Sequence, residues 1–457
     1  MKQPAARVLA LFGVAACMVP RGWSAGDQTT TGGAQEKECR LTVTEAHGAP
    51  RHNELVIVSG AQLLDLFPGQ SIPCSTIQVF DQNKTVPSQV DEKDETGAFV
   101  KNSNGLLDLD DEICFQVSLS ANSQKTLDLR IGNPVAPTST FQNPFSVSKF
   151  DRMTNQQPYH LLVGNGLLEA GICGFENASD VPANQRWKEW HPGCINFLRA
   201  GKHSILGAFD PNSNLPGRDW PESSLPSRPE VLVTGPVRLI VEVEFTPCDI
   251  DWSLRPGTRW DFSGILRGAV QRNIFQFTAD STLIDFTQSV TYESAADDTY
   301  CRTMQYLHLN LSGHGVTQDY VVYSSDQGKP RAEKIHEAIK DAFKDERTTN
   351  HFGFGGSYDG WVAIGDPVNE TGFAIFGAPR ENRMGATVFA GTKYNTNYPI
   401  SIQVVYTASQ LTPARVSRHY WYLVFAQEGL DELVQWRTAY LHPLQITIGP
   451  PEGTAQK

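Results

Sequence analysis

Apolar and polar residues alternate along several stretches of this chain, and that alternation limits the folds open to it. The clearest case is residues 237–245, where every second residue from Val237 to Phe245 is apolar. A period of two is typical of a β-strand that buries one face. The pattern recurs at residues 284–292, 304–311 and 418–425. Because strands do not alternate with helices along the chain, we predict an all-β fold with antiparallel sheets.

Turn residues divide the chain into two β domains. Residues 39–132 hold short apolar stretches separated by Pro, Gly, Asn and Asp, which predicts a small β-sandwich. Residues 133–145 contain three prolines and no periodic pattern, so we interpret them as a linker. The longer alternating stretches of residues 146–450 predict a larger domain of stacked antiparallel sheets. One helix is expected near residues 335–342, where apolar residues recur at helical spacing.

The first 25 residues have the composition of an export signal. Lys2 and Arg7 precede the apolar run 8–17, which is too short to span a bilayer and fits a signal-peptide core. Cys17 ends a sequence that matches a lipobox and would then carry lipid, whereas residues 22–25 suit an ordinary signal peptidase. Residues 26–38 are polar and predict a flexible leader. We expect a secreted, periplasmic or lipid-anchored protein of the outer cell surface, without a transmembrane segment.

The net charge limits the partners that the chain can bind, and the cysteine content limits the disulfides that it can form. The formal net charge is −12, and an acidic surface disfavours nucleic acid as a partner. Eight cysteines are present, and the seven that remain without Cys17 could form up to three disulfides in an oxidising compartment. The candidate pairs are Cys39 with Cys74, Cys74 with Cys114, and Cys173 with Cys194. Buried free thiols are the alternative.

Four stretches carry a family resemblance. The first domain contains LDLDDEICFQVSLSANSQKTLDLRIG, and the second contains GPVRLIVEVEF, NIFQFTADSTLIDFTQSVTYES and DGWVAIGDPVNETGFAIFG. In these stretches the chain resembles a group of secreted bacterial proteins with galactose-mutarotase-like β-supersandwich domains. Related supersandwiches occur in polysaccharide lyases, several glycoside hydrolases and sugar epimerases. The resemblance implies an N-terminal β-sandwich followed by a large antiparallel β-supersandwich with few short helices, and a polysaccharide or oligosaccharide as partner.

A cluster of aromatic and charged residues, RWKEWH at positions 186–191, is the first candidate site. Indole faces suit the apolar CH faces of sugar rings, and polar groups around them suit the hydroxyls. Glu189 and His191 are candidates for acid–base catalysis within it. The candidate sugar-binding residues are Arg186, Trp187, Trp190, Trp220 and Tyr422. The alternative is that long loops cover a sheet and bury their indoles as ordinary packing.

A second candidate site lies on the stretch 418–425, where Arg418, Tyr420 and Tyr422 share one side. Elimination at a uronic acid needs a cation for the carboxylate, a base for the C5 proton and an acid for the leaving oxygen. In a polysaccharide lyase, Arg418 would bind the carboxylate, His191 or His308 would be the base, and Tyr420 the acid. The hypothesis assumes that the strands at 304–311 and 418–425 are neighbours. Ordinary exposed strand residues are the alternative.

Two other functions stay open. The lipobox and the tryptophans fit a non-catalytic glycan-binding protein of the cell surface. A glycoside hydrolase would need two carboxylates about 5–10 Å apart, for which Glu189 and Asp219 are candidates. No cofactor is predicted apart from a calcium ion at an acidic cluster of the first domain, where a solvated loop is the alternative. That cluster consists of Asp91, Asp94, Asp108, Asp110, Asp111 and Glu112.

Overall fold

The protein is an assembly of antiparallel β-sheets, seen here in a computed structural model. The structure describes residues 37–450 except 102, 133–140, 152–156, 158, 175–192, 194, 202, 207–208, 211–227, 246–247, 250–263, 266–269, 292–303, 312–320, 335–349, 358, 367–370, 379–381, 391–399, 407–415 and 427–428. Every strand pairing that these residues make between named strands is antiparallel, and their two α-helices are α1 (Gly60–Leu66) and α3 (Leu430–Leu441). The all-β prediction is therefore confirmed. Neither helix could cross a membrane by its length and hydropathy.

The first domain is a β-sandwich. One sheet has the order β29 (Gln445–Gly449), β1 (Lys37–Thr44), β7 (Gln124–Ile131), β3 (Ile77–Asp81) and β4 (Lys84–Val86). The other sheet has the order β2 (Arg51–Ser59), β6 (Glu112–Leu119) and β5 (Ser88–Asp91). Alternate apolar residues of both sheets, such as Leu41 of β1 and Phe115 of β6, are fully buried in one core. Helix α1 follows β2 and begins with a capping box between Ser59 and Gln62. The 3-10 turn η1 (Cys74–Thr76) precedes β3.

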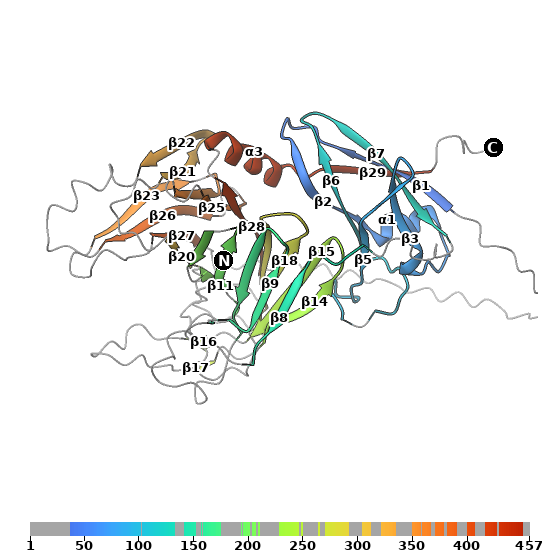
Figure 1. The fold of residues 1–457 in the computed structure, drawn as a ribbon, viewed down its shortest axis with the longest axis horizontal. Coiled ribbons are helices and arrows are strands. Elements are labelled where there is room, and N and C mark those ends of the chain that lie inside the picture. Colours follow the sequence, from blue (N-terminus) through green and yellow to red (C-terminus); the bar gives the residue numbers. More distant parts are fainter. Residues whose placement is uncertain are drawn as a thin grey trace, which may run out of the picture. The chain divides into compact units, whose positions relative to one another are not determined.

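The last strand of the chain belongs to the first domain. Strand β29 pairs with β1 in the register Leu41 opposite Ile448, and Figure 1 shows it in red among the blue and cyan strands. This differs from the predicted second domain of residues 146–450, because residues 445–449 complete the sheet of the first domain instead. The predicted helix near residues 335–342 lies outside the described residues.

The second domain consists of two large sheets. The ten-stranded sheet has the order β23 (Asn350–Ser357), β26 (Asn382–Ala390), β27 (Ile400–Tyr406), β20 (Met304–Leu311), β12 (His203–Leu206), β11 (Ile195–Ala200), β10 (Leu168–Ile172), β9 (Leu161–Gly164) and β8 (Ser146–Lys149), and β13 (Phe209–Asp210) also pairs with β20. The nine-stranded sheet has the order β14 (Glu230–Thr234), β15 (Arg238–Phe245), β18 (Val270–Thr278), β19 (Leu283–Thr291), β28 (Val416–Ala426), β25 (Thr371–Gly377), β24 (Trp361–Asp366), β21 (Val321–Asp326) and β22 (Lys329–Lys334). A two-stranded ribbon, β16 (Cys248–Asp249) with β17 (Gly264–Ile265), stands apart from both.

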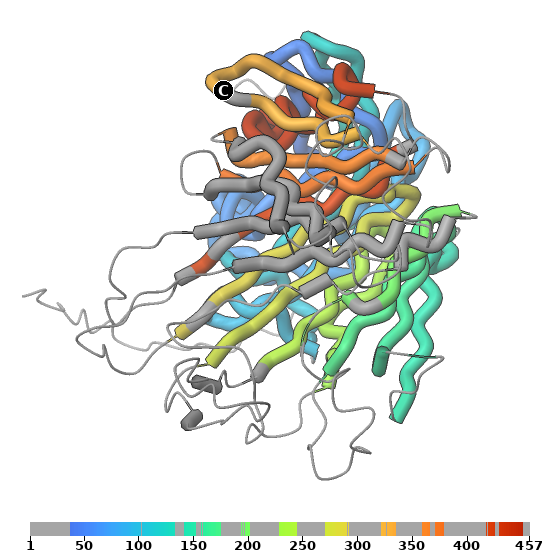
Figure 2. The backbone as a smooth tube through the Cα atoms, turned by 90° about the vertical axis from the view of Figure 1, so that its left-hand side faces the viewer, coloured from blue at the N-terminus to red at the C-terminus, as the bar shows by residue number. Residues whose placement is uncertain are grey.

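The two large sheets bury one hydrophobic core between them. It takes residues from β9, β10 and β11 on one side, such as Val163 and Leu198, and from most strands of the nine-stranded sheet on the other. Strands β15, β18 and β19 are neighbours in the sheet and run side by side (Figure 2). Alternate apolar residues of these strands, such as Val241, Phe275 and Phe286, face this core, as the period of two predicted. The other face of the nine-stranded sheet carries helix α3, whose Leu433 packs with Trp361 and Phe376.

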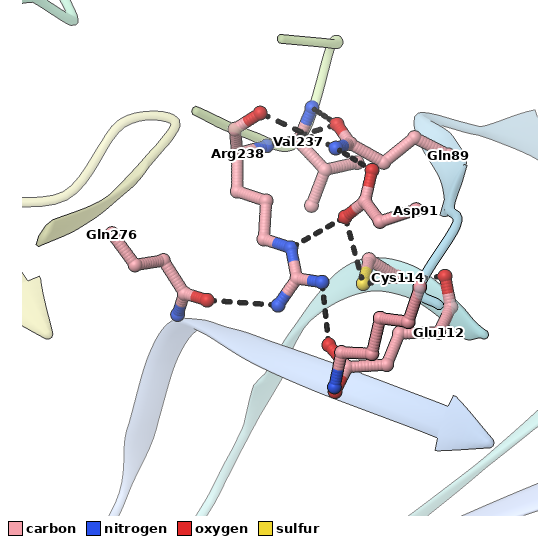
Figure 3. A network of polar contacts seen from close by, with 8 residues as sticks. Gln89, Asp91, Glu112, Cys114, Val237, Arg238 and Gln276 are labelled. Carbon is pink, nitrogen blue, oxygen red and sulfur yellow. Dashed lines mark hydrogen bonds and ion pairs between the residues drawn. The ribbon is translucent and has the colours of Figure 1, made fainter. Parts of the chain in front are cut away.

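A buried ion network joins the two domains (Figure 3). Arg238 of β15 is 1% exposed, and its Nε donates to Asp91 Oδ2 of β5 at 2.6 Å while its Nη2 donates to Glu112 Oε2 of β6 at 2.5 Å. Its Nη1 donates to Gln276 Oε1 at 2.8 Å. Gln89 Oε1 accepts the backbone N–H of Arg238 at 3.0 Å. This network fixes one edge region of the large sheet to the first domain.

Three of the described cysteines, Cys39, Cys74 and Cys114, are free thiols, so the predicted pairs Cys39–Cys74 and Cys74–Cys114 are wrong. Cys194 lies outside the described residues, so the pair Cys173–Cys194 stays a prediction. The thiols of the first domain instead contact polar groups within their own sheets. Cys39 Sγ lies 3.7 Å from the Leu129 carbonyl, and Cys114 Sγ lies 3.6 Å from Asp91 Oδ2. Burial raises the pKa of Cys39 and of Cys74 to about 12, which keeps both protonated.

Candidate functional site

The core between the large sheets becomes polar toward one end. The cross-strand row Val241, Phe275, Phe286 and Tyr420 is wholly buried, with one residue from each of β15, β18, β19 and β28. Two residues further along the same strands, the row reads Val243, Asn273, Gln288 and Arg418. Asn273 is 0% and Gln288 1% exposed, and Gln271 at the next inward position is buried as well. Burying an amide costs free energy unless it is hydrogen-bonded. Three buried amides at one end of an apolar core therefore indicate a candidate functional site.

One of these amides, that of Asn273, binds Gly193, which follows the RWKEWH cluster in the chain. Asn273 Nδ2 donates to the Gly193 carbonyl at 3.0 Å, and Gln271 Nε2 donates to Asn273 Oδ1 at 3.1 Å. The Gly193 N–H donates to the Cys173 carbonyl at 3.0 Å. Cys173 and Gly193, which lie on either side of positions 175–192 in the chain, therefore meet at the polar end of the core.

His160 and Gly193 also help to hold the residues that flank positions 175–192. His160 is 3% exposed, and its Nδ1 accepts the N–H of Gly174 at 2.9 Å, so this ring nitrogen carries no proton. Gly193 has a φ of 71°, a left-handed conformation that favours glycine over other residues. Cys173 between them is buried. The residues on either side of positions 175–192, from Cys173 to Gly174 and at Gly193, are thus held by hydrogen bonds to buried parts of the fold.

The predicted residues of the RWKEWH cluster lie outside the described residues. This applies to Arg186, Trp187, Glu189, Trp190 and His191, and equally to Trp220 and Asp219. Their roles stay predictions. The structure adds the position of flanking residues, since Gly193 is hydrogen-bonded to both Cys173 and Asn273.

Strand β28 carries the predicted residues Arg418, Tyr420 and Tyr422 of the second site. Arg418 occupies the register position opposite Gln288, in the polar row. Tyr420 and Tyr422 are 1% and 2% exposed, and the rings of both stack on Phe286, with centroids 6.2 and 5.3 Å away. The alternative of ordinary exposed strand residues does not hold at either tyrosine, because this side of β28 faces the core between the two sheets. Their burial gives no support to an acid role for Tyr420 or a sugar contact for Tyr422.

The predicted base His308 lies in the other large sheet. It belongs to β20 and stands opposite Ser401 of β27. Strands β20 and β28 are therefore not neighbours in one sheet, contrary to the assumption behind the lyase hypothesis.

The acidic cluster of the first domain is occupied by internal contacts. Asp111 is fully buried, and its carboxylate accepts the backbone N–H groups of Lys93 and Asp108 at 2.9 and 2.7 Å. Asp94 Oδ1 accepts the N–H of Thr96 at 2.8 Å within its own turn. Asp91 and Glu112 bind Arg238. The described residues contain no group of three or more His, Cys, Asp or Glu side chains that could hold a metal ion.

Three buried polar residues were not among the predicted site residues, although the sequence contained a signal for them. Asn273 interrupts the inward positions of an alternating stretch that continues with Phe275 and Phe277, so a polar residue stands where an apolar one is expected. Gln271 on β18 and Gln288 on β19 are likewise polar residues at inward positions of alternating strands. His160 had no such signal, because its partner Gly174 is known only from the fold.

Comparisons with known proteins returned structural similarity only. No family model matches the chain, and no curated protein sequence matches it. Among solved structures, an alpha-mannosidase from Enterococcus faecalis V583 aligns at 12% identity and a TM-score of 0.48, covering 90% of this chain and 46% of its own. An alpha-N-acetylgalactosaminidase from Bifidobacterium bifidum aligns over 61% of this chain and 38% of its own, at 10% identity and a TM-score of 0.37.

A smaller protein aligns with part of the chain. A galactose mutarotase related enzyme from Lactobacillus acidophilus covers 58% of this chain and 97% of its own, at 10% identity and a TM-score of 0.32. The chain spans about half the length of the mannosidase. Since all three TM-scores lie below 0.5, the fold assignment rests on the strand topology itself.

Proposed function

We propose that this chain is an exported carbohydrate-active protein whose glycan site lies at the polar end of the second domain's core. The observation that carries the proposal is the 3.0 Å hydrogen bond from Asn273 to the Gly193 carbonyl. It ties the segment with the RWKEWH cluster to a row of residues that leads across β19 to Arg418. Adjacent strands lie about 4.8 Å apart, so the backbone positions of Asn273 and Arg418 are separated by two such steps.

The chemistry of these groups favours an acidic glycan. Indole rings bind the apolar faces of sugar rings, and a guanidinium binds a carboxylate through two parallel hydrogen bonds. Trp187 and Trp190 supply the first kind of group and Arg418 the second. The amides of Asn273 and Gln271 keep the surroundings polar without adding a negative charge that would repel a uronate. Export rests on the signal-like residues 1–25.

A lyase reaction at this site would be a β-elimination. A base removes the C5 proton of the uronate, a C4–C5 double bond forms, and the C4–O4 bond breaks while the leaving oxygen takes a proton. Arg418 would neutralise the carboxylate, and His191 of the RWKEWH cluster is the candidate base. The buried ring of Tyr420 leaves the acid without a candidate from β28.

The reaction is tested with a panel of uronate polysaccharides and of neutral polysaccharides. A lyase produces unsaturated sugars, which are followed by their ultraviolet absorbance, whereas a glycoside hydrolase produces reducing ends without that absorbance. We expect Arg418→Ala to abolish binding of the uronate substrate and any elimination. Arg272→Ala, on the exposed face of β18, is the matched control. Absence of binding to every member of the panel would end the proposal.

A non-catalytic glycan-binding protein is the second candidate, and the burial of Tyr420 favours it. Here Trp187→Ala and Trp190→Ala abolish binding, while no product forms from any glycan that binds. Binding by calorimetry together with both product assays separates this candidate from the lyase and from the hydrolase.

A further inference from the structure

Strand β28 carries a polar pair on its outer face, opposite the core. His419 Nε2 lies 2.9 Å from Asp285 Oδ2 of the neighbouring strand β19. The two side chains are 47% and 25% exposed, so both reach solvent. Because successive residues of a strand point to opposite faces, this pair is separated from the polar row of the core by the thickness of the sheet.

The imidazole of His419 is held in one orientation. Its ring stacks on Tyr440 of helix α3, with centroids 5.6 Å apart and an angle of 8° between the ring planes. The Tyr440 hydroxyl donates to the His419 carbonyl at 2.9 Å. Asp285 Oδ2 also accepts Trp421 Nε1–H at 3.1 Å, which fixes the carboxylate from a second side. An exposed histidine with this many constraints is prepared for a partner, because little side-chain entropy is left to lose.

The pair has free hydrogen-bonding capacity that points away from these contacts. Within the described part of the chain, neither His419 Nδ1 nor Asp285 Oδ1 takes part in a hydrogen bond. One ring nitrogen and one carboxylate oxygen thus remain for hydroxyl groups, each of which can donate and accept. Trp421 lies beside them and is only partly buried, so an aromatic ring borders the polar pair.

We propose that His419, Asp285 and Trp421 form a second glycan-binding site, which holds one sugar residue on the outer face of the nine-stranded sheet. The sugar hydroxyls bind His419 Nδ1 and Asp285 Oδ1, and a CH face of the ring lies against Trp421. Burial lowers the pKa of His419, but the hydrogen bond and the charge of Asp285 outweigh it and raise the pKa above its ordinary value. The imidazole therefore donates from Nδ1 over a wider pH range than an isolated histidine.

The site is tested by nuclear magnetic resonance on the full chain. Oligosaccharides with and without a uronate are added while the imidazole signals of His419 and the indole N–H signal of Trp421 are followed. We expect at least one oligosaccharide to shift both signals, and its affinity to fall by roughly tenfold in Asp285→Asn, since a charged acceptor is lost. His52→Ala, an exposed histidine on β2, is the matched control and leaves the affinity unchanged.

Two results would overturn the site. One is the absence of any shift at His419 and Trp421 with every oligosaccharide, and the other is an unchanged affinity in Asp285→Asn. The circular dichroism of each variant confirms that it is folded. Arg418→Ala separates this inference from the proposed function, because it removes binding at the core end and leaves the His419 shifts in place.

Discussion

Arg238 Nε donates to Asp91 Oδ2 across 2.6 Å, and this contact joins residues that are 147 positions apart in the chain. Both side chains are almost wholly buried, with 1% and 3% exposed. The guanidinium forms a second ion pair, in which Arg238 Nη2 lies 2.5 Å from Glu112 Oε2. Burial disfavours the charged form of Arg238, but these carboxylates outweigh it and raise the pKa of the group. The pair therefore stays ionised in the interior.

Loss of the guanidinium should destabilise the protein strongly. We expect Arg238→Met to lower the free energy of unfolding by about 3–5 kcal/mol, because the buried carboxylate of Asp91 loses its counter-charge while Glu112 keeps Lys93 as its partner. Arg272→Met is the matched control, since Arg272 pairs with Glu244 on the surface, where both side chains are more than two-fifths exposed. There the expected loss is about 0–1 kcal/mol. Urea unfolding of both variants provides the measurement, and equal losses would contradict the prediction.

Acid should weaken the first domain through Glu45. Burial alone would raise the pKa of Glu45, but backbone N–H groups, among them those of Asn122, His47 and Gly48, donate to its carboxylate and lower the pKa from 4.5 to about 2. A folded-state pKa below the unfolded value means that the stabilisation is present above pH 4.5 and is lost as the pH falls toward about 2.

In the variant Glu45→Gln, stability should depend less on pH between pH 5 and pH 2. Thermal unfolding between pH 5 and pH 2 is the measurement. Glu54→Gln serves as the control, because burial raises the pKa of Glu54, and its protonation in acid adds stability instead of removing it. A Glu45→Gln curve as steep as that of the unmodified protein would refute the assignment.

The local pattern predicted the strands well and their partners poorly. Alternation in residues 237–245 identified the inward residues Val241 and Val243, which are fully buried. The same pattern cannot say which strand lies beside which, because pairing depends on contacts far apart in the chain. Strand β29 shows this, since its five residues return to β1 across some 400 positions. The contact between Arg238 and Asp91 was invisible for the same reason.

The sequence predicted which residues share one side of the strand at the candidate site, but not which of their side chains are buried. The sequence indicated Arg418 and Tyr420 on one side of a strand, and the register confirms their alternation. It could not tell that this side faces a second sheet, which buries Tyr420. The inward polar residue Asn273 was visible in the alternation, and only the fold shows that it holds Gly193.

The histidine on the outer face of β28 should titrate at a higher pH than an isolated histidine. Asp285 raises the pKa of His419, so the stabilisation that the pair gives is complete below the unfolded pKa and is lost as the pH rises through the folded pKa. We expect Asp285→Asn to lower the pKa of His419 and to remove this loss of stability. The imidazole signals followed between pH 5 and pH 9 give the result. An identical titration in both proteins would contradict it.

The hydrogen bond from Asn273 to Gly193 should matter for binding more than for folding. In Asn273→Leu the Gly193 carbonyl loses its donor, which we expect to cost about 1–3 kcal/mol of unfolding free energy. Asn165→Leu is the matched control, since Asn165 is also buried and donates to the carbonyls of Thr278 and Ser281 at 2.8 and 2.7 Å, away from Gly193. Both variants should lose similar stability, measured by urea unfolding, but Asn273→Leu alone should lose glycan affinity. Equal affinities in the two variants would show that the hydrogen bond from Asn273 to Gly193 does not position a glycan site.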